Sequence, residues 1–251
     1  MIMTKRVFGN SRLTSTPRAG LHHKIARKIG SLIARGSLAP GEVLPNETSL
    51  GIKFGVSRTA LREAMKVLAS KGLIEVRRKT GTRVRPSTDW NLLDPDVLSW
   101  LFSGPEVPGT LIDLMDVRKT VEPASARMAA GRATEENLRE IEGALQGMEL
   151  AINDLPSSIE PDLQFHLAIL KATHNIFMKP FGALIQTALR ASFKITSSDQ
   201  EAYERTLALH RAVFVAIKSR NEREAEGAMI LVLAQTSKDM EVTISRTPAV
   251  R

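Results

Sequence analysis

The chain has 251 residues, of which 43% are hydrophobic and 25% charged, a composition typical of a soluble globular protein with a small and a larger domain. It contains no cysteine, which excludes disulfides, thiolate metal sites and cysteine nucleophiles. No apolar run is long enough to cross a membrane, and the first residues lack the apolar stretch of a secretory signal. We therefore expect a cytoplasmic protein with no membrane partner.

The positive charge is concentrated in the first third of the chain. The whole chain carries a net charge of +8, while residues 1–86 hold eighteen basic residues and only four acidic ones. This asymmetry indicates a polyanion as the partner of the first third. The alternative is a basic surface that serves solubility alone, and only the residue pattern distinguishes the two.

Helical signals follow a tail of residues 1–20. Apolar residues at helical spacing predict a helix over 21–34. A second, short helix begins after its N-cap Asn46 and ends at Gly55. A third begins at Ser57, so that the glycine-containing turn before it is typical of a helix-turn-helix.

The third helix and the segment after it complete a winged helix. Between Ser57 and Ser70, apolar residues form one face of the helix and basic residues the other. Residues 72–85 then alternate apolar and polar around a turn at Lys79-Thr-Gly81, which predicts a basic hairpin, the wing. The sequence therefore predicts a winged helix-turn-helix domain, α with a small β wing, over residues 21–86.

The polar faces of this domain suit DNA. Arg58 and Arg62 can form paired hydrogen bonds with guanine in the major groove, and Ser57 and Thr59 can hold phosphates. The wing offers further basic residues for the DNA backbone or the minor groove: Arg77, Arg78, Lys79 and Arg83. For each arginine, the alternative is a solvated charge or a phosphate contact that reads no sequence.

The rest of the chain predicts helices only. We assign residues 87–96 to a linker, with Asp94 as the N-cap and Pro95 as the first residue of a helix. Helical patterns separated by capping signals then predict an all-α antiparallel bundle over residues 97–245, whose core can enclose a ligand.

Several polar residues interrupt apolar helical runs in this bundle. Arg118 and Glu122 are four residues apart, as are Asp162 and His166, and His210 lies in a third run. The last three could bind a divalent metal such as zinc or nickel, and Arg118 could hold the carboxylate of an effector. The alternatives are hydrogen-bonded core histidines and an ordinary exposed Asp–His pair.

The segments Leu44-Pro-Asn-Glu47, Phe54-Gly-Val-Ser-Arg-Thr-Ala-Leu-Arg-Glu-Ala64 and Thr80-Gly-Thr-Arg-Val84 resemble the DNA-binding domain of GntR-type bacterial transcription regulators. In that family the start of helix two, the start and middle of helix three and the wing tip contact operator DNA. The resemblance implies DNA contacts by Thr48, Ser57, Arg58, Thr59, Arg62, Arg78, Lys79, Thr80 and Gly81. Because members often carry Arg at the place of Thr48 and Gly at the place of Lys79, the preferred operator can differ here.

The second domain is similar to the effector domain called FCD of FadR-type GntR regulators, over about residues 97–240. The similarity rests on Arg118-Lys-Thr-Val-Glu122, Asp162-Leu-Gln-Phe-His166 and His210. It implies an effector site with Arg118, Glu122, Asn175 and Thr206, and metal ligands Asp162, His166 and His210. Metal-containing members add a third histidine, where this chain has Val232. A site with only three ligands allows three alternatives: it binds a metal more weakly, the effector supplies the fourth ligand, or the site holds no metal.

The stretch from Trp90 to Trp100 resembles members that respond to sugar acids, which implies an effector such as galactonate. We therefore expect a homodimeric transcription regulator without enzymatic activity, a repressor that releases operator DNA when the acid binds. An activator is the alternative to a repressor. The competing hypotheses are a metal-dependent enzyme with an attached DNA-binding domain and a nonspecific nucleic-acid binder.

Overall fold

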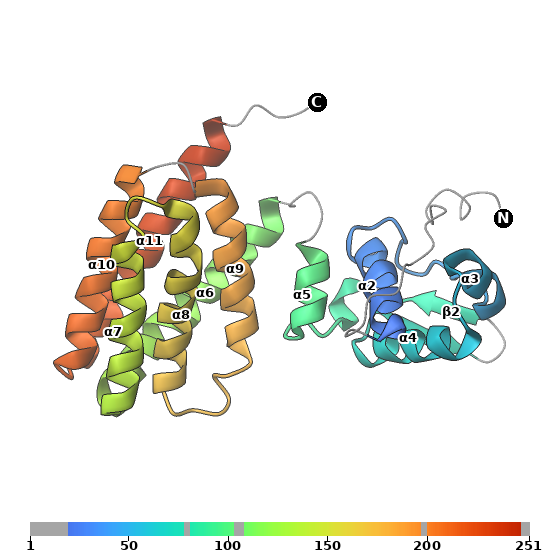
Figure 1. Cartoon of the computed structure of the whole chain (residues 1–251), viewed down its shortest axis with the longest axis horizontal. Coiled ribbons are helices and arrows are strands. Elements are labelled where there is room, and N and C mark those ends of the chain that lie inside the picture. Colours follow the sequence, from blue (N-terminus) through green and yellow to red (C-terminus); the bar gives the residue numbers. More distant parts are fainter. Residues whose placement is uncertain (1–19, 78–80, 103–107, 197–199, 247–251) are drawn as a thin grey trace. The chain divides into compact units, whose positions relative to one another are not determined.

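The computed structural model describes residues 20–77, 81–102, 108–196 and 200–246 (Figure 1). The chain forms two compact units, Met1–Pro105 and Glu106–Arg251, here called the first and second unit. The first unit contains α2 (Leu21–Ala34), α3 (Glu47–Phe54), α4 (Arg58–Ser70), β1 (Ile74–Arg77), β2 (Gly81–Val84), the 3-10 turn η1 (Ser87–Asp89) and α5 (Pro95–Leu101). The second contains α6 (Pro108–Arg132), α7 (Glu135–Leu150), α8 (Leu155–Ala172), α9 (Phe181–Thr196), α10 (Gln200–Lys218) and α11 (Glu222–Arg246).

Local signals determine where α3 and α4 begin and end. The side chain of Asn46 accepts a hydrogen bond from Ser49 N at 2.8 Å, and Ser57 accepts one from Ala60 N at 3.2 Å. Gly55, with a φ of +66°, ends α3 in the left-handed conformation that glycine adopts without strain. The predicted helix-turn-helix is therefore confirmed.

The wing is a two-stranded antiparallel sheet. Ile74 pairs with Val84 and Arg77 with Gly81. Ile74 and Val84 are buried in the core of the first unit, together with Ile29, Leu61 and other apolar residues of the three helices. The hairpin is thereby attached to the helix-turn-helix.

Helix α5 belongs to the first unit. Val97 and Trp100 are part of its core, and the Trp100 ring lies so close to α2 that a Cβ atom at Gly30 would come within 2.2 Å of it. Lys71, at the end of α4, forms ion pairs with Asp94 (2.6 Å) and Asp96. The compact unit thus extends past the linker that we expect at 87–96, because an apolar face of α5 packs on the glycine of α2.

The second unit is the expected all-α bundle. Its helices α7, α8, α9, α10 and α11 run roughly alongside one another in Figure 1, and α6 packs against α8, α9, α10 and α11. Between α8 and α9 the core includes Leu163, Leu170, Ile185 and Leu189. No helix in the described parts of the chain is long and apolar enough to cross a membrane.

Candidate functional site

The first candidate site is the polar face of α4. Ser57, Arg58, Thr59 and Arg62 are exposed, whereas the opposite face, including Leu61, is buried in the core. Neither Arg58 nor Arg62 forms a hydrogen bond or ion pair with another described residue that would restrain its guanidinium. Both guanidinium groups are therefore available to an anionic partner.

The other predicted DNA contacts lie beside this helix. Thr48 is exposed in the first turn of α3, and Arg77, on the wing, forms an ion pair with Glu75 at 2.9 Å. Arg83 instead donates to the carbonyl oxygen of Gly41 at 2.6 Å and ties the wing to the loop before α3. Gly81 is exposed at the start of β2, whereas Arg78, Lys79 and Thr80 lie outside the described residues.

The second candidate site is a cavity of about 80 Å³ inside the bundle. All helices of the second unit contribute to its wall. The lining residues are Arg118 of α6, Met148 of α7, Leu155, Ser158, Asp162 and His166 of α8, Leu189, Ser192 and Phe193 of α9, Ala202, Tyr203, Thr206 and His210 of α10, and Thr236 and Asp239 of α11.

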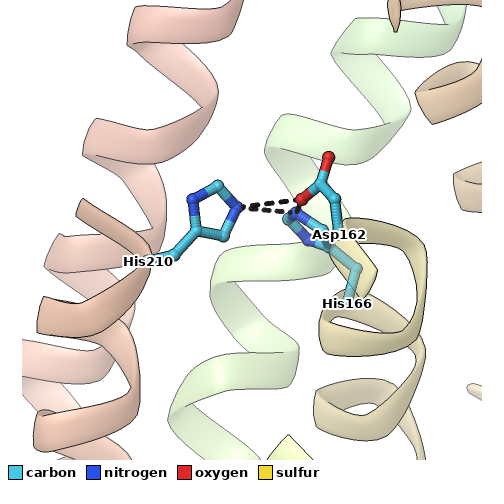
Figure 2. Close-up of side chains that lie close together, drawn as sticks. All are labelled: Asp162, His166 and His210. Carbon is cyan, nitrogen blue, oxygen red and sulfur yellow. Dashed lines mark hydrogen bonds and ion pairs between the residues drawn. The ribbon is translucent and has the colours of Figure 1, made fainter. Parts of the chain in front are cut away.

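Asp162, His166 and His210, here called the triad, line the cavity and lie close together (Figure 2). Asp162 Oδ1 lies 3.4 Å from His166 Nε2 and 3.2 Å from His210 Nε2. The two Nε2 atoms are themselves 3.2 Å apart. Three potential ligand atoms from two helices thus surround one point.

The partners of the other ring nitrogens determine what these atoms can do. His210 Nδ1 lies 2.7 Å from the carbonyl oxygen of Thr206, which can only accept, so Nδ1 carries a hydrogen. His166 Nδ1 likewise faces the carboxylate of Glu122. In the neutral rings both Nε2 lone pairs therefore point toward Asp162 Oδ1. Three acceptors converge, and a cation, either a proton or a metal ion, must lie between them.

A buried ion pair between Arg118 and Glu122 lies next to His166 of the triad. Arg118 and Glu122 are 1% and 3% exposed, and Arg118 Nε donates to Glu122 Oε1 at 2.5 Å. Burial would raise the pKa of Glu122, but the positive charges of Arg118 and His166 outweigh it and lower the pKa to about 2. The Glu122 carboxylate beside His166 is therefore ionised.

The pKa values of His166 and Asp162, the two triad residues on α8, are shifted in opposite directions. Burial disfavours charge on His166, but the carboxylates of Glu122 and Asp162 outweigh it and raise its pKa to about 9. Burial also opposes the charge of Asp162, but the two histidines dominate and lower the pKa of its carboxyl group. Without a metal ion, the shared cation is accordingly a proton on His166.

The structure brings together most of the predicted effector residues. Arg118 and Thr206 line the cavity, and Glu122 lies behind His166. Asn175 does not line it. It sits in the turn after α8, where its side chain accepts a hydrogen bond from Phe177 N at 3.0 Å. The chain turns away before it, because His174 adopts a φ of +51°.

Five polar cavity residues are absent from the sequence prediction, and one of them is Ser192 of α9. Ser158 precedes Asp162 by one helical turn and Tyr203 precedes Thr206 by three residues, so helical spacing from the predicted residues could have found both. Thr236 and Asp239 lie on α11, and only the packing of α11 against the other helices places them at the cavity.

A winged helix-turn-helix with an exposed basic helix, joined to a helical domain with a polar cavity, defines a DNA-binding transcription regulator. Residues 21–84 match the family of bacterial regulatory proteins named gntR, and residues 113–235 match the FCD domain. The chain belongs to the GntR family and carries an FCD domain.

Two relatives show how far this similarity extends. The chain is 36% identical over 219 residues to the galactonate operon transcriptional repressor of Escherichia coli (strain K12), covering 87% of this chain and 96% of that protein. It is 30% identical over 232 residues to the HTH-type transcriptional repressor NanR of Klebsiella aerogenes, covering 90% and 88%. A solved structure of Lar, which controls the expression of the Listeria monocytogenes agr system, shares the fold. Its TM-score is 0.62 at 18% identity, covering 90% of this chain and 99% of that one.

Proposed function

We propose that the protein is a cytoplasmic homodimeric repressor of a sugar-acid catabolic operon, and that a sugar acid such as galactonate releases it from its operator. The observation that carries this proposal is the cavity in which Arg118 and the triad lie together. The 36% identity to a galactonate operon repressor over most of both chains supports the choice of acid.

Arg118 suits the role of carboxylate anchor. A guanidinium has five N–H donors, and Glu122 engages the one on Nε. Nη1 lies 3.8 Å from the sulfur of Met115, a weak acceptor. The terminal nitrogens are therefore suited to the paired hydrogen bonds that arginine forms with a carboxylate.

The triad fits a zinc or nickel ion. Its three ligand atoms are 3.2–3.4 Å apart, and a tetrahedral ion with bonds of about 2.0–2.1 Å has ligand atoms about 3.3 Å apart. The Thr206 carbonyl and Glu122 hold the two rings from behind, as outer partners of metal-bound histidines do. Val232, buried in α11, supplies no fourth ligand, which leaves that position to water or the effector.

Charge balance favours an anionic effector. A divalent ion in the triad, together with Arg118, Glu122 and Asp162, would leave one net positive charge in this buried part of the cavity. Asp239, the other carboxylate of the wall, has Arg205 at 4.0 Å as its counter-ion. In such a site an opposite charge interacts more strongly than at the surface. A monocarboxylate would neutralise it.

We assign operator recognition to the exposed face of α4. Arg58 and Arg62 would read bases in the major groove, while Ser57, Thr59 and Thr48 would hold phosphates. Wing residues Arg77 to Gly81, of which 78–80 lie outside the described residues, would contact the DNA beside it. A homodimer would present two such DNA-binding domains to half-sites about one turn of the DNA double helix apart.

The experiment is a gel-shift titration of the protein with DNA from its own promoter region and with scrambled DNA of equal length. We expect a preference of roughly a thousandfold or more for the promoter at moderate salt, and release when galactonate is added. Equal affinity for both DNAs would instead identify a nonspecific binder. Unchanged promoter binding with every sugar acid tested would exclude the proposed effector, and recovery of chemically altered galactonate would indicate an enzyme.

A further inference from the structure

We propose that the part of the cavity beyond the triad is a distal subsite, formed by Ser158, Tyr203, Thr236 and Asp239, that accepts hydroxyl hydrogens of a five- or six-carbon sugar acid. The inference rests on the proposed function, because it takes Arg118 as the anchor of the effector carboxylate. Beyond the proposed function, it states that the protein recognises the hydroxyl groups of the effector and selects the length of its carbon chain.

The subsite lies along the helices that carry the triad. On α10, Tyr203, Thr206 and His210 form one stripe at spacings of three and four residues, and all three line the cavity. Ser158 lies one turn before Asp162 on α8 and lines the same cavity. On α11, Asp239 lines the same cavity, and its carboxylate lies 4.0 Å from the guanidinium of Arg205 of α10.

The hydroxyl groups of this wall already donate their hydrogens to the backbone. The bonds are Ser158 Oγ to Leu155 O (2.7 Å), Tyr203 Oη to Met148 O (2.8 Å), Thr206 Oγ1 to Ala202 O (2.8 Å) and Thr236 Oγ1 to Val232 O (3.0 Å). A hydroxyl whose hydrogen is used in this way keeps oxygen lone pairs that can only accept. Asp239, whose carboxylate accepts from Gln235 at 2.8 Å, is also an acceptor.

A wall of acceptors requires a ligand with donors. The hydroxyl groups of a sugar acid supply one hydrogen each, whereas an alkyl chain would offer no donor to the remaining lone pairs of these oxygens. A second carboxylate at the far end would face Asp239 and repel it. The cavity therefore suits a monocarboxylate with hydroxyl groups along its chain, rather than a fatty acid or a dicarboxylate.

The length of the stripe sets the length of the acid. At about 1.5 Å per residue, Tyr203 and His210 are about 10 Å apart along α10. At about 1.25 Å per bond, an extended six-carbon acid measures about 9 Å between its end oxygens and a three-carbon acid about 5 Å. The longer acid therefore matches the rise between His210 and Tyr203, and the three-carbon acid is too short for it.

The experiment measures, by calorimetry on the full-length protein as purified, the affinities of four probes: galactonate, glycerate, hexanoate and galactarate. They vary chain length, hydroxyl groups and a second carboxylate in turn. We expect galactonate to bind at least tenfold more tightly than each of the other three. Equal affinity for galactonate and hexanoate, or for galactonate and galactarate, would overturn the subsite.

Two variants locate the effect within the cavity. Tyr203→Phe and Asp239→Asn should each weaken galactonate binding about tenfold and change glycerate binding less than twofold, because glycerate does not reach them. The control is Glu204→Gln, which makes the same carboxylate-to-amide change on an exposed residue of α10. If Tyr203→Phe does not fold, Thr236→Val replaces it.

Failure of the subsite and failure of the proposed function give different results. If both variants bind galactonate as the wild type does, the subsite is wrong and the proposed effector stands. If the wild-type protein binds its promoter but none of the sugar acids, the proposed effector is wrong and the subsite falls with it.

Discussion

His210 donates its Nδ1 hydrogen to the carbonyl oxygen of Thr206, 2.7 Å away and one turn earlier in α10. Because this bond fixes the tautomer of the ring, the Nε2 lone pair of His210 points at Asp162 Oδ1 and His166 Nε2. His166 Nδ1 faces the carboxylate of Glu122 in an ion-pair contact. Both histidines thus present their Nε2 atoms to Asp162 Oδ1.

Removal of His210 should separate metal binding from DNA binding. In His210→Ala the triad retains two ligands, so we expect the metal content of the purified protein to fall and galactonate no longer to release operator DNA. Operator affinity itself should stay within about twofold, because α4 lies in the other unit. Elemental analysis and gel shift measure the two effects. His23→Ala, which alters an exposed histidine of the first unit, is the control for metal content, and full metal content together with an intact galactonate response in His210→Ala would contradict the site.

Glu122→Gln tests the outer partner of the triad. The amide removes the charge beside His166 Nδ1, and loss of such an outer carboxylate typically weakens metal binding by about 10- to 100-fold. It also leaves Arg118 buried without its counter-ion, which we expect to cost roughly 3–5 kcal/mol of unfolding free energy. Competition with a metal chelator and denaturant unfolding measure the two quantities. Glu160→Gln, on an exposed face of α8, is the matched control; the same metal affinity in both variants would rule out this role of Glu122.

Arg58→Ala and Arg62→Ala test the assignment of α4. If either arginine reads a base, its loss should cost about 1–3 kcal/mol of operator binding and relax the preference at one base pair. If an arginine contacts only phosphate, its replacement should weaken the binding of promoter DNA and of scrambled DNA equally. Lys66→Ala, on the same helix but paired with Glu63, serves as the comparison. Unchanged promoter affinity in both arginine variants would show that α4 does not recognise the operator.

Gly30→Ala tests the attachment of α5 to the first unit. The added Cβ atom would lie 2.2 Å from the Trp100 ring, so α5 must move or the core must open. We expect a loss of about 1–3 kcal/mol of unfolding free energy, as for an overpacked core. Gly143→Ala in α7, where an added Cβ meets nothing within 4 Å, should instead stabilise its helix by about 0.5–1 kcal/mol. Equal melting temperatures for the two variants would mean that α5 does not depend on Gly30.

The limits of the helix-turn-helix follow from the sequence because their causes are local. Asn46, Gly55 and Ser57 act on backbone groups within a few residues, so their spacing predicts α3, the turn and α4. The alternation of apolar and polar residues around Lys79-Thr-Gly81 predicts the wing, and the strands β1 and β2 of the structure pair as expected. The pairing of Asp162 with His166 on α8 likewise follows from their spacing of four residues, which places both side chains on one helix face.

Contacts between distant segments are decided only by the tertiary structure. Asn175 follows the α8 motif closely, yet the turn at His174 directs the chain away from the cavity. Asp239 lies far from the triad in the chain, yet α11 brings it to the same cavity. Capping and helical period determine which residues share a helix face, whereas the packing of whole helices determines which faces meet. The sequence therefore determines the helices and the chemistry of the triad, and the packed bundle decides which side chains complete the site.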